Sequence, residues 1–210
     1  MADYRFEPWS QPLKVICLTG GLAAGKSTAV KYLEQQGAKV IDADVLGHRA
    51  YDPGTDAFNA VVNTFGDDVK SEDGEIDRRV LGGKVFGQPE KLKQLTDIVW
   101  PEIRRLAENE ISMSQKSNPE KIVVLEAAVL FEAGWENVGD EVWVVVVDPE
   151  TAIERAMARD GYPRESVQSR LDSQLSNEER IARADVIITN NAQTEDMIKQ
   201  LDEAWANTNA

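Results

Sequence analysis

Short apolar runs alternate with amphipathic segments along most of the chain. Runs rich in Val, Ile and Leu, typical of parallel strands that are buried on both faces, occur at 14–19, 38–42, 122–125, 142–147 and 186–189. Between or after them, apolar residues recur with the spacing of a helix at 27–36, 149–159, 164–175 and 194–205. Strands that alternate with helices are joined by right-handed crossovers. We therefore predict an α/β fold in which helices cover both faces of a parallel sheet.

The segment from 43 to about 120 interrupts this alternation. It is far longer than the roughly 10–15 residues of a crossover helix, and turn signals at Pro53-Gly54, Gly82-Gly83 and Pro89 divide it into amphipathic stretches. Because a long loop without secondary structure is uncommon in a compact domain, we predict a largely helical lobe beside the sheet.

The same pattern suggests the remaining boundaries. Pro8 and Pro12 prevent a helix across residues 1–13, which we expect to be an irregular lead-in to a single domain over 14–205. An arginine-rich segment at about 153–183 is a second candidate lobe. The core of the domain is then expected to come from residues 14–42, 121–150 and 184–205.

Composition narrows the class of protein. The 210 residues, 42% of them hydrophobic, suffice for one domain with a buried core. The formal net charge of -14 argues against a protein that coats nucleic acid, because phosphate neutralisation needs a surplus of Lys and Arg. A single cysteine and a single histidine exclude a disulfide framework and a Cys or His cluster for a metal. With no apolar run of about 18 residues and no apolar signal segment, we expect a cytoplasmic protein that does not insert into membranes.

The strongest chemical signal is a glycine-rich loop, Gly20-Gly21-Leu22-Ala23-Ala24-Gly25-Lys26-Ser27, which fits the pattern G-x-x-x-x-G-K-[ST] in full. It follows a predicted strand and opens a predicted helix, as in the three-layer fold of P-loop NTPases. Glycines let backbone N–H groups wrap a phosphate, and the dipole of the new helix favours an anion. We expect Lys26 to reach the β- and γ-phosphates of ATP, and Ser27, followed by Thr28 in the same site, to offer its hydroxyl to Mg²⁺.

Two aspartates, Asp42 and Asp44, end the second predicted strand. An extended backbone would project both to one side at the carboxyl edge of the sheet, where α/β proteins bind ligands. We predict that Asp44 accepts a hydrogen bond from the attacking hydroxyl of an acceptor. Asp42 would contact substrate, orient Asp44 or hold a metal-bound water; the alternative is that it caps a helix starting near Ala43. Glu126, at the end of the third strand, is a further candidate for a water-mediated metal contact.

Neighbouring side chains have less definite roles. His48, four residues after Asp44, is expected to pair with that aspartate or to face solvent, since phosphoryl transfer needs little help from a strong base. Glu132 would face either the substrate or solvent. We expect the aromatic residues Trp100, Phe131 and Trp135 to pack in the core or in a lobe; the alternative is that one of them meets an adenine.

A protein with a net charge of -14 that binds polyphosphate must gather cations locally. Arg155 and Arg159 have i, i+4 spacing on one predicted helix face, where two guanidinium groups could clamp a transferring phosphoryl group. The alternative is a solvated face whose arginines pair with neighbouring acids such as Asp160. We favour the clamp because a phosphate loop lies upstream, whereas for Arg170 and Arg180 both readings stay open.

Taken in order, these residues resemble the dephospho-CoA kinase family. The likeness covers roughly 14–205, and the ordered set is specific although each motif is generic. It rests on Thr19-Gly20-Gly21 through Ser27, Ile41-Asp42-Ala43-Asp44, Pro53-Gly54, Phe65-Gly66, Asp77-Arg78, Leu81, Val85-Phe86, Leu130-Phe131-Glu132, Arg155 with Arg159-Asp160-Gly161, Arg170 with Gln174, and Ala184-Asp185 with Asn190.

The resemblance implies transfer of the ATP γ-phosphate to the ribose 3′-hydroxyl of dephospho-CoA, the last step of coenzyme A synthesis. It implies that Asp44 is the catalytic base and that residues 43–120 form a CoA-binding lobe with Arg78 near the CoA phosphates. Residues from 153 to about 183 would form a lid, and Asn190 would lie beside the adenine of ATP. The expected substrates are ATP and dephospho-CoA, with Mg²⁺ as cofactor.

The chain departs from the usual bacterial pattern at two places. It has Trp100-Pro101 where bacterial members usually carry His-Pro, and Ala128-Val129-Leu130 where they carry Pro-Leu-Leu. Both departures resemble the kinase half of the animal bifunctional CoA synthase, whose adenylyltransferase half is absent here. The resemblance implies a stand-alone kinase of that subtype or an excised domain with an adenylyltransferase partner, and leaves mitochondrial association open.

Other functions fit the residues less well. Another P-loop kinase, acting on a nucleoside, sugar or shikimate-like alcohol, would not require so long a helical interval. A GTPase switch would need an Asn-Lys-x-Asp motif, which Thr189-Asn190-Asn191-Ala192 does not supply. A CoA- or nucleotide-sensing protein that has lost catalysis would not need Lys26, Ser27 and Asp44 intact.

Overall fold

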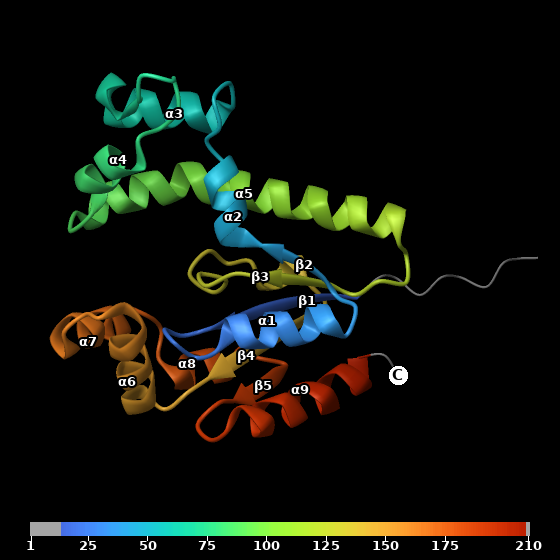
Figure 1. Cartoon of the computed structure of the whole chain (residues 1–210). Helices are drawn as coiled ribbons and strands as arrows, with labels where there is room; N and C mark the ends of the chain where they lie inside the picture. The colour runs from blue at the N-terminus through green and yellow to red at the C-terminus, as the bar shows by residue number, and fades with distance from the viewer. Residues whose placement is uncertain (1–13, 209–210) are drawn as a thin grey trace, which may run out of the picture.

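The structure, a computed structural model that describes residues 14–208, is built on a five-stranded parallel sheet (Figure 1). The strand order is β2-β3-β1-β4-β5, and every neighbouring pair is parallel. The strands are β1 (Val15–Gly20), β2 (Lys39–Asp42), β3 (Val123–Glu126), β4 (Glu141–Val146) and β5 (Val186–Thr189). Each lies on one of the predicted apolar runs, so the predicted α/β class is confirmed.

The central strand β1 explains why the apolar runs are continuous rather than alternating. All six of its residues are buried, because helices cover the sheet on both sides. Ile16 and Leu18 pack with the helices α1 (Lys26–Gln35) and α9 (Thr194–Thr208) on one face. Val15 and Cys17 belong to the cluster on the other face, where the long helix α5 (Pro89–Ser117) lies across the sheet (Figure 1).

The segment between β2 and β3 is helical, as predicted. Its short helices stand beside α5 at the top of Figure 1, where Thr55 and Asp77 cap two of them through their side chains. They are α2 (Ala43–Arg49), α3 (Asp56–Phe65), the 3-10 helix η1 (Asp67–Val69) and α4 (Arg78–Val85). Together with α5 they form what we call the helical lobe.

The arginine-rich segment is a second group of helices, here called the lid. It comprises α6 (Pro149–Asp160), α7 (Arg164–Asp172) and α8 (Asn177–Ile181). Ile153, Ala156 and Val167 form a small apolar cluster that packs against Leu22 and Ala23 of the glycine-rich loop. The lid therefore rests on that loop.

The 3-10 helix η2 (Glu136–Val138) precedes β4. The predicted lead-in at 1–13 lies outside the described residues. Within 14–208, no helix combines the length and apolar character needed to cross a bilayer.

Candidate active site

The glycine-rich loop joins β1 to α1 at the carboxyl edge of the sheet. Two of its residues adopt left-handed backbone conformations, Ala23 with φ 51° and Gly25 with φ 106°. A Cβ on Gly25 would lie 2.3 Å from Nδ2 of Asn190, and a Cβ on Gly20 would lie 2.4 Å from the carbonyl oxygen of Val145. These two glycines are therefore required by close approach, and the loop leaves a concave backbone suited to an anion.

Lys26 is fixed by the backbone of the same loop. Its Nζ donates a hydrogen bond to the carbonyl oxygen of Gly20 at 3.0 Å. Burial lowers the pKa of Lys26, and the nearby carboxylates of Glu126 and Asp44 oppose that shift. The next residues, Ser27 and Thr28, are exposed.

The carboxylates lie at the same edge, but not as an extended backbone would place them. The chain turns helical at Ala43, and Oδ1 of Asp42 caps α2 by accepting from the backbone N–H of Asp44 at 2.7 Å and of Val45 at 3.2 Å. The expectation that an extended strand projects both aspartates is thus wrong, and the alternative that Asp42 caps a helix is confirmed. Asp44 is exposed in the first turn of α2.

Glu126 lies next to Asp42 in the β2–β3 register. Burial raises the pKa of Glu126; the charge of Lys26 opposes this shift, while the negative charges of Asp42 and Asp44 add to it. Lys26, Asp42, Asp44 and Glu126 therefore interact electrostatically at the carboxyl end of the sheet, and we call these four residues the charged centre. Among residues 14–208, no group of three or more His, Cys, Asp or Glu is arranged to hold a metal ion, so these acids do not form a complete ligand set.

Of the two expectations for His48, pairing with Asp44 or facing solvent, the structure shows the second. His48 is exposed, and no hydrogen bond joins its ring to that aspartate in the part of the chain that the structure describes. Instead, the backbone carbonyl of His48 accepts from Nη2 of Arg78 at 3.0 Å, and the Arg78 guanidinium lies 5.7 Å from the centre of the Tyr51 ring. Arg78 therefore links α4 to α2 within the helical lobe.

The two predicted clamp residues on α6 differ in their contacts. Arg159 makes a two-pronged ion pair with Asp160, at 2.7 and 2.9 Å, which is the alternative that the sequence left open. The side chain of Arg155, in contrast, makes no hydrogen bond or ion pair with any of residues 14–208. Its guanidinium is therefore the uncommitted cation of the pair.

Two lid side chains touch the loop more closely. Arg180 is 2% exposed, donates through Nη1 to the carbonyl of Leu175, and would lie 3.4 Å from a Cβ placed on Gly21. Burial lowers the pKa of Arg180, and the carboxylates of Glu132 and Glu179 oppose that shift. Glu132 itself is exposed. The sequence left the role of Arg180 open because its burial depends on the fold of the lid.

Gln174 makes a contact with the glycine-rich loop that the sequence did not predict. Its Oε1 accepts from the backbone N–H of Leu22 at 3.0 Å, so a lid side chain occupies a donor of the phosphate loop. Its place in the ordered motif set, after Arg170, was the available signal. Arg170 is stacked on Tyr162, 4.3 Å from the ring centre.

Asn190 supports the loop from behind. It is 8% exposed and its Nδ2 donates to the carbonyl of Ala24 at 2.8 Å. Thr19, at the end of β1, has a buried hydroxyl with no hydrogen-bond partner among the described residues. The contact of Asn190 with adenine stays a prediction.

The aromatic residues pack as predicted. The rings of Trp100 and Trp135 meet edge to face, 6.4 Å between centres, and Phe131 is buried beneath the Arg183 guanidinium. These contacts belong to the cluster between the sheet and the helical lobe.

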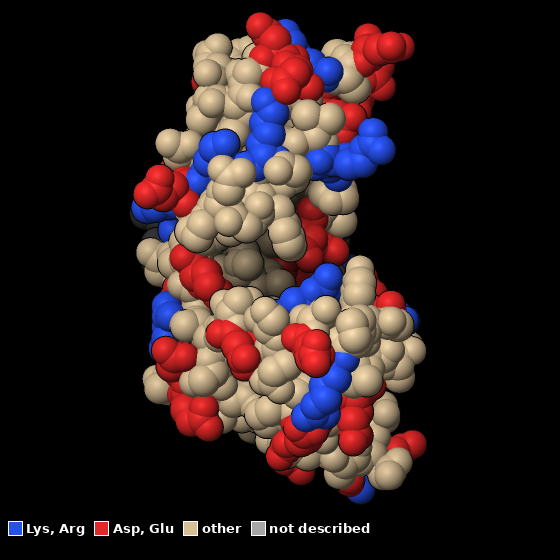
Figure 2. Space-filling model, turned by 90° about the vertical axis from the view of Figure 1, so that its left-hand side faces the viewer, with Lys and Arg blue, Asp and Glu red and all other residues tan. Residues whose placement is uncertain are grey.

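Two cavities open near the charged centre. One, of about 450 Å³, lies between the loop and the lid and is lined by Gly21, Leu22, Leu171, Gln174 and Arg180, among others. The other, of about 360 Å³, is lined by Asp44, Trp100 and Trp135, among others. Figure 2 shows the molecule hollowed on this side, with acidic and basic side chains near the hollow.

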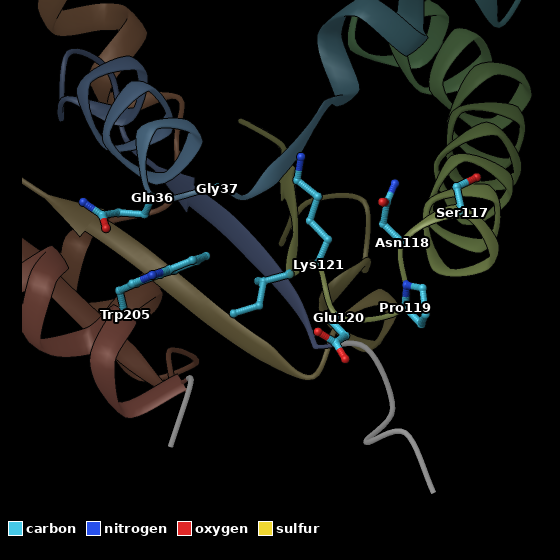
Figure 3. A pocket seen from close by; sticks show the side chains of 9 residues that line it. Gln36, Gly37, Ser117, Asn118, Pro119, Glu120, Lys121 and Trp205 are labelled. Atoms are coloured by element: carbon cyan, nitrogen blue, oxygen red, sulfur yellow. The ribbon is translucent and has the colours of Figure 1, made fainter. Parts of the chain in front are cut away.

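A further cavity of about 510 Å³ lies at the opposite end of the strands (Figure 3). It is lined by Gln36, Gly37, Trp205 and the segment from Ser117 to Ile122. None of the predicted site residues is among them.

Comparisons with known proteins agree with this geometry. A family model described as dephospho-CoA kinase matches residues 14–196. A dephospho-CoA kinase of Geobacter sulfurreducens is 44% identical over 92% of this chain and 98% of that protein. Among solved structures, dephospho-CoA kinase from Campylobacter jejuni has 29% identity and a TM-score of 0.71, with 93% of this chain and 96% of that one covered. A Thermus thermophilus protein has 33% identity and a TM-score of 0.76, with 94% and 98% covered.

Proposed function

The chain belongs to the dephospho-CoA kinase family, and we propose that the site at the carboxyl edge of its sheet performs that reaction. The γ-phosphate of ATP is transferred to the ribose 3′-hydroxyl of dephospho-CoA, which gives coenzyme A and ADP. The observation that supports this assignment is a complete phosphate loop whose Lys26 interacts electrostatically with the carboxylates of Glu126 and Asp44 at the carboxyl edge of the sheet.

Binding of the triphosphate would rest on the loop. Its backbone N–H groups and the N-terminus of α1 favour an anion, and Lys26 would move from the Gly20 carbonyl to the phosphates. The exposed hydroxyl of Ser27 is an oxygen ligand of the kind that Mg²⁺ prefers. Ser27, with Asp42 or Glu126 through water, would hold Mg²⁺, and the ion would neutralise charge on the phosphates.

Activation of the acceptor would rest on Asp44. Its carboxylate is exposed at the edge of the hollow, where it can accept the hydrogen of the 3′-hydroxyl as that oxygen attacks phosphorus. A loose phosphoryl-transfer transition state needs positioning more than a strong base, so orientation of the hydroxyl is the main contribution of Asp44.

Charge that develops on the transferred group would be met by the lid. Arg155 is already uncommitted, whereas Arg159 would have to exchange Asp160 for a phosphate oxygen. Arg180 stands beside the loop without moving. Guanidinium groups suit this task because they bind phosphate oxygens in pairs.

The dephospho-CoA itself would extend over the helical lobe. We propose residues 43–120 as the CoA-binding lobe, with Arg78 near the phosphates of the acceptor, and the segment 153–183 as the lid within one domain over 14–205. Glu132, opposite Arg180, would contact the substrate. We further propose that the protein acts in the cytoplasm; an adenylyltransferase partner stays a prediction from the resemblance.

A substrate panel tests the assignment. Purified protein with Mg-ATP should phosphorylate dephospho-CoA and leave adenosine, shikimate and a simple sugar unchanged, as measured by ADP release and by mass spectrometry of the product. Chelation of Mg²⁺ should stop turnover. ATP binding without phosphorylation of dephospho-CoA would contradict the proposal.

A further inference from the structure

Helix α2 carries a glycine in its interior, Gly47, three residues after Asp44 and therefore on the same face. Both line the cavity of about 360 Å³ at the edge of the sheet, together with Trp100, Ile103, Val129 and Trp135. A volume of this size is within the range of small-molecule sites.

Neither backbone conformation nor packing accounts for Gly47. Its φ is not among the positive values found in the described chain, so any residue could adopt its backbone conformation. A Cβ there would lie 3.4 Å from Cδ1 of Ile103, the flexible end of a side chain that can give way. Glycine inside a helix is less stable than alanine. We therefore attribute the glycine at this position to a need for room in the cavity that it lines.

Two of the residues that line the cavity, Trp100 and Trp135, are aromatic. Trp100 is half-buried and stands edge to face with Trp135, which is buried. The lining of the cavity therefore includes both a carboxylate, that of Asp44, and two indole rings. A nucleoside matches this lining, because its base can stack on an aromatic side chain and its sugar hydroxyl can donate a hydrogen bond to a carboxylate.

We propose that this cavity receives the nucleoside end of dephospho-CoA, with adenine against Trp100 and the ribose passing Gly47 so that the 3′-hydroxyl reaches Asp44. This inference rests on the proposed function and specifies its acceptor site. Gly47 and Trp100 act as positioning and specificity residues for the acceptor, and they have no role toward ATP.

Steady-state kinetics with each substrate varied separately test the inference. Gly47→Ala should raise the KM for dephospho-CoA about tenfold, the effect of one methyl group in a fitted pocket, and leave the KM for ATP unchanged. Its thermal midpoint should stay equal or rise, since alanine favours the helix. The control is Glu203→Ala, at an exposed position of α9 outside both the helical lobe and the lid; it should change neither KM.

Trp100 supplies an independent arm. Trp100→Ala should raise the KM for dephospho-CoA about tenfold or more, as expected for loss of a stacking partner, whereas Trp100→Phe should keep most of the affinity. Both variants should retain the ATP KM of the wild type.

The outcomes separate this inference from the proposed function. Wild-type CoA synthesis with an unchanged dephospho-CoA KM in Gly47→Ala and Trp100→Ala would overturn the inference alone, as would an equal rise in both KM values. If the wild type makes no CoA, calorimetric titration with dephospho-CoA decides: weaker binding by Gly47→Ala than by Glu203→Ala supports the site, and equal or absent binding overturns it.

Discussion

Gly25 offers the sharpest test of how the phosphate loop is built. It is the N-cap of α1 with φ 106°, and a Cβ would lie 2.3 Å from Nδ2 of Asn190. That amide donates to the carbonyl of Ala24 at 2.8 Å. Gly25→Ala must therefore both hold alanine in a left-handed conformation and displace Asn190 from its partner.

The two effects have different sizes. A left-handed conformation costs an L-residue about 1–2 kcal/mol, and loss of the Asn190 hydrogen bond about 1 kcal/mol, more if the Ala24 carbonyl is left without a partner. We expect Gly25→Ala to lower the free energy of unfolding by about 2–4 kcal/mol. This is a large share of the roughly 5–15 kcal/mol that a domain of this kind has.

Urea unfolding of four variants, Gly25→Ala, Gly37→Ala, Asn190→Ala and the double variant, separates these two contributions. Gly37→Ala is the matched control, because Gly37 has φ 99° and a Cβ there would meet nothing within 4 Å. It should lose only the conformational part, about 1–2 kcal/mol. Asn190→Ala removes the obstacle, so the double variant with Gly25→Ala should lose at least about 1 kcal/mol less than the sum of the single losses.

Equal losses for Gly25→Ala and Gly37→Ala, together with additive behaviour of the double variant, would refute the reasoning. Those results would mean that Asn190 does not limit the space at the loop. The left-handed conformation alone would then account for the glycine.

Further predictions concern catalysis, pH and reactivity. Asp44→Asn should lower kcat far more than it weakens ATP binding, whereas Asp196→Asn, at an exposed aspartate in the first turn of α9, should retain wild-type kinetics. Equal losses of kcat and ATP affinity in Asp44→Asn would indicate a structural carboxylate. Lys26→Ala should lower kcat/KM, with a loss of about 3 kcal/mol of transition-state stabilisation. An unchanged kcat/KM would show that Lys26 takes no part in the reaction. Burial raises the pKa of Glu126 in the folded protein, so the stability that its protonation contributes is present below the ordinary pKa and is lost as pH rises through the folded value. Glu126→Gln should therefore be more stable than the wild type at pH 8 and lose that advantage near pH 4. Thermal unfolding without nucleotide measures this difference. Burial raises the pKa of Cys17 to about 12, so iodoacetamide at pH 8 should label native protein far more slowly than urea-unfolded protein.

The sheet could be predicted because its strands are buried on both faces and so appear as continuous apolar runs. The run that became β1 is the clearest case, since every residue in it is buried. The helical character of the segment between β2 and β3 was also accessible from its turn signals. The positions of α3 and α4 against α5 were not, because they depend on contacts between residues far apart in the chain.

The site was predicted in part. The loop sequence carries its own pattern, so Lys26 could be assigned from neighbours alone. Asp42 could not be, because a strand that ends in a cap and a strand that simply continues have the same local sequence. Arg180 and Gln174 depend on a lid that folds back onto the loop, and no local pattern reports that return.

Helix α5 is 29 residues long, about 44 Å at 1.5 Å per residue, and it belongs to the helical lobe at one end and to the sheet at the other (Figure 1). Pro101 in its interior lacks the amide hydrogen that would bond to the carbonyl of Asp97, which makes this point the weakest along the rod. The helix therefore lacks one backbone hydrogen bond beside Trp100, a residue that lines the same cavity as Asp44. Bending of α5 at this proline would change the distance between Trp100 and Asp44 across the cavity that both line.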